Sequence, residues 1–163
     1  MPQGINNGLY SILVLTGPRQ DRQGDEVLSE KSRTRREYEH KVLVLDDDFD
    51  LASLVKQILQ RHGFKSVFAF TDPLLALEHF RLNYMDYSLI ISDIRMPIMN
   101  GFEFVREARK INPKVKVLLM TAFEIDDKEF ARVLPNPKID GLIHKPASST
   151  QILSTISKTM IMN

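Results

Sequence analysis

The sequence of 163 residues contains no cysteine. This absence excludes disulfides and thiolate metal sites, and it is compatible with a reducing cytoplasm, which we expect as the location. No apolar run approaches the roughly 20 residues that a membrane-spanning helix needs, so we expect no membrane contact. The short apolar run Leu9–Leu15 lacks a preceding basic stretch and a following small-residue cleavage site, so we do not interpret it as a signal peptide.

An excess of charge of either sign is also missing. The 22 basic side chains nearly balance the 21 acidic ones and leave a net charge of +1. This balance gives no reason to expect direct binding to nucleic acid or to an anionic membrane. The length and the 43% hydrophobic content are typical of one globular domain with a sizeable core.

The chain divides near residue 40 into two parts of different composition. Residues 1–40 hold one β-prone run, Leu9–Leu15, and a polar stretch, with six basic and six acidic side chains in all. Because so few apolar groups cannot offset the entropy of ordering, we expect a flexible leader, or residues ahead of the true start. A partner-docking arm or an extra strand is the alternative. Residues 41–163 are expected to form the folded domain.

Short apolar runs alternate with helically spaced segments from residue 41 onward. We expect strands near 42–45, 67–70, 89–91, 115–120 and 142–143, and helices near 51–62, 73–82, 101–112, 126–134 and 148–160. Five strand–helix repeats with short connections predict an α/β fold, in which helices cover both faces of a doubly wound, five-stranded parallel sheet. Strands that are apolar throughout support burial on both sides.

Polar side chains stand where these predicted strands end. They are Asp46, Asp47 and Asp48 after the first strand, Asp93 after the third, Thr121 after the fourth and Lys145 after the fifth. In open α/β sheets, ligands bind at this edge. Converging carboxylates repel one another and need a cation, and a few hard oxygen ligands suit Mg²⁺, which also holds phosphate oxygens. A carboxylate nucleophile at such a site can form an acyl phosphate.

Four motifs, in this order, make the interpretation specific. They are Val44-Leu45-Asp46-Asp47-Asp48, Ser92-Asp93-Ile94-Arg95-Met96-Pro97-Ile98-Met99-Asn100-Gly101, Met120-Thr121-Ala122 and His144-Lys145-Pro146. Together they resemble the receiver domains of two-component response regulators, over about residues 41–160. The resemblance implies a flavodoxin-like sheet of strand order 2-1-3-4-5 and a stand-alone receiver similar to chemotaxis regulators. It also implies a signalling domain that assists its own phosphoryl transfer and dephosphorylation, not a turnover enzyme.

The resemblance implies a phosphoacceptor and a metal site. Asp93 would accept the phosphoryl group from a phosphohistidine on a sensor histidine kinase or phosphotransfer protein. Mg²⁺ would be held by Asp46, Asp47, Asp93 and the backbone carbonyl of Arg95. The signal would then pass to a downstream protein that the sequence does not identify.

The resemblance also implies how the phosphorylated state is held and read. Lys145 would pair with Asp93 and then with the phosphoryl group, while Thr121 would move to hydrogen-bond a phosphoryl oxygen. The peptide bond between Lys145 and Pro146 is expected to be cis. Leu142 stands where these receivers commonly carry Tyr or Phe, so the coupling of Thr121 to the output surface is expected to differ from the usual one.

Two other functions are compatible with parts of the pattern. One is a receiver-like module that binds partners without phosphorylation. The other is a haloacid-dehalogenase-type phosphatase, but that family needs an acidic pair after the lysine, and no Asp or Glu follows Lys145. Asp48 or Asp50 is more simply a helix cap than a ligand. The histidines share no metal-ligand spacing, so we expect structural or surface roles for them.

Overall fold

The computed structural model describes residues 41–122 and 138–161. The elements, in chain order, are β1 (Lys41–Leu45), α2 (Phe49–Arg61), β2 (Val67–Phe70), α3 (Pro73–Asn83), β3 (Tyr87–Asp93), α4 (Gly101–Ile111), β4 (Lys116–Thr121), β5 (Gly141–His144) and α6 (Ser149–Ile161). The leader predicted at 1–40 and the helix predicted at 126–134 lie outside the described residues. No helix in the described ranges is long and apolar enough to span a membrane.

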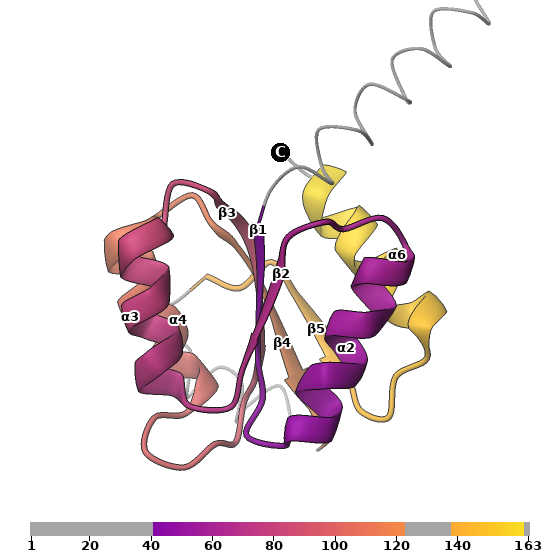
Figure 1. Cartoon of the computed structure of the whole chain (residues 1–163), viewed down its shortest axis with the longest axis horizontal. Helices are drawn as coiled ribbons and strands as arrows, with labels where there is room; N and C mark the ends of the chain where they lie inside the picture. Colours follow the sequence, from indigo (N-terminus) through magenta and orange to yellow (C-terminus); the bar gives the residue numbers. More distant parts are fainter. Residues whose placement is uncertain (1–40, 123–137, 162–163) are drawn as a thin grey trace, which may run out of the picture.

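All five strands are parallel and form one sheet in the order β2-β1-β3-β4-β5. Helices α3 and α4 cover one face, and α2 and α6 cover the other (Figure 1). The doubly wound fold and its strand order are therefore confirmed. The order reverses at β1, so the carboxyl ends of β1 and β3 lie side by side at the switch point where α/β sheets bind ligands.

The sheet is buried on both faces because successive side chains of a strand point to opposite sides. In β1, Leu43 and Leu45 belong to the core under α3 and α4, whereas Val42 and Val44 belong to the core under α2 and α6. All four side chains are at most 1% exposed. Complete burial of each such side chain stabilises the fold by roughly 1.5–3 kcal/mol. The two cores together fix the strand ends in space.

Side-chain caps determine where three helices begin. Asp48 accepts hydrogen bonds from two backbone N–H groups in the first turn of α2, and Asp72 does the same for α3. Asn100 and Glu103 form a reciprocal capping box at α4, with N···O distances of 3.0 and 2.9 Å. Such caps contribute about 1 kcal/mol each. The capping role predicted for Asp48 is confirmed, and the Asn100 box adds a signal that the sequence analysis missed.

Candidate functional site at the carboxyl edge of the sheet

Two buried carboxylates and one ammonium group meet at the carboxyl edge of the sheet. Asp46 follows β1 and Asp93 ends β3, and these residues are 4% and 7% exposed. Lys145, which follows β5, places its Nζ 2.5 Å from Asp46 Oδ2 and 2.7 Å from Asp93 Oδ1. The structure thus joins three residues that lie far apart in the sequence. The pairing of Lys145 with Asp93 was expected, whereas its contact with Asp46 was not.

The charges in this cluster do not cancel completely. Burial alone lowers the pKa of Lys145, but hydrogen bonds and attraction from Asp46 and Asp93 outweigh it, so the pKa lies above its ordinary value. Lys145 is therefore cationic at neutral pH. One ammonium between two carboxylates leaves an excess of negative charge at the sheet edge, which favours binding of a further cation.

Backbone N–H groups hold both carboxylates in fixed orientations. Asp46 Oδ1 accepts from the backbone N–H of Asp48 at 3.0 Å, and Asp93 Oδ2 accepts from that of Arg95 at 2.8 Å. Each carboxylate therefore has one oxygen on Lys145 and the other on the turn that follows its strand. This double attachment fixes where the acids point before any ligand binds.

Thr121 lies at the same edge, at the end of β4, and is 2% exposed. Its backbone carbonyl accepts a hydrogen bond from the backbone N–H of Lys145 at 2.6 Å. The peptide bond between Lys145 and Pro146 is cis, as predicted. The turn after β5 is thereby attached to the end of β4, close to Asp93 on the adjacent strand β3.

Asp47 and Arg95 border an open cavity of about 590 Å³ whose lining also includes Met96 and Asn100. The side chain of Asp47 is exposed, in contrast to that of its buried neighbour Asp46. Within residues 41–122 and 138–161, no three Asp, Glu or His side chains lie close enough to hold a metal ion by themselves. Asp47 is thus on the solvent side of the cluster that Lys145 joins.

The oxygen atoms at this edge fit Mg²⁺ chemically. This hard cation usually keeps several waters and takes only one or two carboxylates from a protein, together with phosphate oxygens. Asp46 and Asp93 supply two buried, oriented carboxylates with excess negative charge between them. A cage of three close acidic side chains is therefore not needed for this metal.

Gly101 accounts for the spacing of the motif that follows β3. Its backbone N–H donates to the carbonyl oxygen of Ile94 at 2.9 Å. A Cβ atom at this position would lie 2.2 Å from the carbonyl oxygen of Asp93, far inside van der Waals contact. Only glycine allows α4 to begin directly against the end of β3. The helix start and the candidate acceptor are therefore in backbone contact.

Leu142 lies in β5, where it pairs with Leu119 of β4 and packs, half-buried, against the core under α3 and α4. It therefore links the edge strand to the helix layer next to the cavity. The described histidines have no ligand-like arrangement. His62 caps α2 through a 2.8 Å contact with a backbone carbonyl, His79 lies among aromatic rings and His144 is exposed. His40 lies outside the described residues.

A family model for the response regulator receiver domain matches residues 42–157. The chain therefore belongs to this family and is a receiver domain of two-component signalling. Mg²⁺ binding and phosphorylation are general features of the family, whose members act as signalling domains that interact with histidine kinases or phosphotransfer proteins and with downstream targets. This membership does not favour the phosphatase alternative.

Several relatives have nearly the same extent as the matched domain. The chain is 30% identical over 126 residues to the response regulator receiver protein CpdR of Brucella abortus, with 74% of this chain and 97% of that protein covered. It is 26% identical to the chemotaxis protein CheY of Bacillus subtilis, with coverage of 74% and 98%. The solved structure of CheY4 of Vibrio cholerae has a TM-score of 0.62 at 29% identity, with coverage of 74% and 98%.

Other relatives are much longer. The chain is 33% identical to the transcriptional regulatory protein ZraR of Klebsiella oxytoca, but the match spans only 26% of that protein. It is 27% identical to the autoinducer 1 sensor kinase/phosphatase LuxN of Vibrio harveyi, and the match spans 17% of its length. The similarity to these proteins thus concerns the receiver domain and not their further activities.

Proposed function

We propose that Asp93 accepts a phosphoryl group from a phosphohistidine on a sensor histidine kinase or a phosphotransfer protein. The observation that carries this proposal is the contact of Lys145 with both Asp46 and Asp93 at the switch point of the sheet. An Asp93 oxygen attacks phosphorus while the bond from phosphorus to the donor nitrogen breaks. Lys145 then neutralises charge on the phosphoryl oxygens, and Thr121 donates a hydrogen bond to one of them.

We assign the metal site to Asp46, Asp47, Asp93 and the backbone carbonyl of Arg95. Bound Mg²⁺ would neutralise charge on the transferring group and orient it toward the acceptor. Asp46 and Asp93 would contribute buried oxygens, and Asp47 would contribute one from the solvent side. The excess negative charge beside Lys145 supports this assignment.

The output that we propose is a two-state change in packing. Movement of Thr121 at the end of β4 would alter the packing of Leu142 on the neighbouring strand β5, and with it the surface near α4. A downstream protein would read this surface. The domain would assist its own phosphorylation and dephosphorylation without turning over a separate substrate, in the cytoplasm and without direct binding to nucleic acid or membrane.

Intact-protein mass after incubation with acetyl phosphate tests the acceptor. We expect wild type to gain one phosphoryl group in the presence of Mg²⁺, and Asp93→Ala to gain none. Asp48→Ala is the matched control, because this nearby acid caps α2 and should leave labelling intact. Far-UV circular dichroism should show that all three proteins are folded.

Other outcomes of the labelling experiment are also decisive. Labelling that persists in Asp93→Ala would refute the acceptor assignment. A wild-type protein that binds Mg²⁺ but gains no mass would favour the alternative of a receiver-like module that binds partners without phosphorylation.

A further inference from the structure

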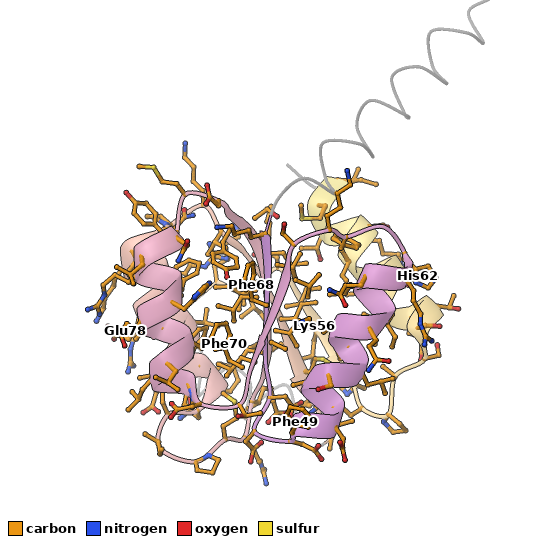
Figure 2. All side chains as sticks on the ribbon, viewed as in Figure 1. Phe49, Lys56, His62, Phe68, Phe70 and Glu78 are labelled. Carbon is orange, nitrogen blue, oxygen red and sulfur yellow. The ribbon has the colours of Figure 1, made fainter. Side chains whose placement is uncertain are left out.

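The outer face of α3 is apolar, although nothing in the described parts of the chain covers it. Leu74 and Leu75 are 50% and 58% exposed at its start, and Leu82 and Met85 are 78% and 79% exposed at and just beyond its end. Glu78 lies on the side of α3 away from the sheet (Figure 2), and Arg81 of the same helix is exposed as well. The inner face of the helix, with Ala76, Leu77 and Phe80, is apolar and buried, so the four exposed side chains are apolar surface beyond what packing on the sheet requires.

The neighbouring helix in the same layer provides a comparison. α4 directs Arg106 and Lys110 to solvent and exposes no large apolar side chain. The outer face of a surface helix is thus polar next to α3, as expected for contact with water. A group of exposed apolar side chains such as that on α3 marks a surface that another chain segment covers.

The described part of the chain begins at Lys41, beside the carboxyl end of α3. The backbone N–H of Lys41 donates to the carbonyl of Asp86 at 3.0 Å, and its Nζ lies 3.2 Å from Asn83 Oδ1 and 2.9 Å from Asp86 Oδ2. Asn83 and Asp86 are sequence neighbours of Leu82 and Met85. Whatever precedes residue 41 therefore leaves the domain at the carboxyl end of α3.

We propose that the apolar run Leu9–Leu15 docks on this outer face of α3, which comprises Leu74, Leu75, Glu78, Leu82 and Met85. The run is the one concentrated apolar segment of residues 1–40. If the run were helical, Leu9, Ile12 and Leu13 would lie on one side of it. If it were extended, alternate apolar residues would lie on one side. Either arrangement matches a face whose apolar side chains surround the two exposed charged residues Glu78 and Arg81. The proposal does not depend on phosphorylation of Asp93.

The connection is long enough for this docking. About 25 residues, 16–40, stand between the run and residue 41, and a flexible chain of that length would separate its ends by roughly 25–30 Å. The eleven residues of α3 extend over only about 16 Å. Such a tether keeps the run at an effective concentration on the order of millimolar near the helix, so that even weak apolar contacts suffice.

The lack of cysteine makes a direct test possible. Ser11→Cys in the full chain carries one nitroxide spin label within the run, and amide signals of the ¹⁵N-labelled protein report what the label approaches. We expect loss of signal in residues 74–85 and none in α6, which lies on the opposite face of the sheet (Figure 1). Reducing the label should restore every signal and show that the domain is folded.

Two substitutions and one mixture complete the test. Leu82→Asp should restore the α3 signals, whereas Leu54→Asp, an exposed leucine on α2 in the other layer, should not. Mixing spin-labelled ¹⁴N protein with unlabelled ¹⁵N protein distinguishes contact within one chain from contact between copies. Signal loss at α3 in the mixture would assign the face to a second copy and overturn the proposal. Absence of loss at α3, or equal loss throughout the domain, would overturn it as well.

Discussion

The hydroxyl group of Tyr87 is buried at the start of β3, and within the described residues it has no hydrogen-bond partner. Its ring packs against Phe80 and Phe68, at centroid distances of 5.4 and 6.1 Å. Figure 2 shows Phe68 between the sheet and α3, so the tyrosine belongs to an aromatic layer beneath that helix. Burial first, and then the charge of Asp86, raise the pKa of Tyr87 above its ordinary value of 10.0.

This shift has a definite consequence for stability. Because Tyr87 ionises more easily in the unfolded chain, its contribution is complete below about pH 10 and is lost as the pH rises toward the folded pKa. Tyr87→Phe should therefore lose less unfolding free energy between about pH 9 and about pH 11 than wild type does. At neutral pH it should match wild type or gain up to about 1 kcal/mol, since an unsatisfied buried hydroxyl is removed.

Urea denaturation at the two pH values measures this difference. Tyr84→Phe is the control, since that tyrosine lies at the partly exposed end of α3. It should show the wild-type loss of stability. Equal loss in Tyr87→Phe and wild type would refute the argument from burial.

α4 begins in close backbone contact with the end of β3. A methyl group at position 101 would meet backbone of Asp93, which cannot rotate away. Gly101→Ala should therefore lower the unfolding free energy by about 1–3 kcal/mol, as overpacking does in cores. It should also reduce Mg²⁺-dependent labelling, because the strain falls on the backbone of the proposed acceptor.

Gly141→Ala provides the matched control for that prediction. Its new Cβ would approach a side-chain atom of Leu118 at 2.7 Å, and that leucine end can shift. The stability loss, measured by chemical denaturation, should be smaller than for Gly101→Ala. Equal losses of unfolding free energy would show that a clash with backbone at position 101 destabilises the fold no more than a clash with a side chain does.

The order of elements and most of the site could be predicted from sequence for a simple reason. Strand ends in a parallel sheet share one edge, so Asp46, Asp93 and Lys145 had to lie near one another once five strands were identified. Contacts that depend on how far a side chain extends, or on how closely two elements approach, could not be predicted in this way. The second carboxylate partner of Lys145 depends on where its Nζ comes to rest, and the need for glycine at position 101 depends on how closely α4 approaches β3.

At the scale of the described molecule, the candidate site and residue 41 lie at opposite ends of the strands. All proposed metal ligands lie between Asp46 and Arg95, and residue 41 enters the sheet at the opposite ends of the strands. Deleting residues 1–40 should therefore leave the Mg²⁺ dissociation constant almost unchanged in a calorimetric titration. Asp46→Asn in the full chain should weaken binding strongly, since it removes a buried carboxylate charge. A large loss of affinity on deletion would show that residues 1–40 contribute to the site.

The position of Lys145 would make the proposed metal binding an exchange of cations. The ammonium group already occupies one oxygen of Asp46 and one of Asp93, so an arriving metal ion must share or displace these contacts. The net affinity would then be smaller than the attraction of the metal ion for the two acids alone, because the contacts with Lys145 are weakened or lost. A domain built in this way would keep one cation on both acids when the ion leaves, so that their charge would stay partly compensated.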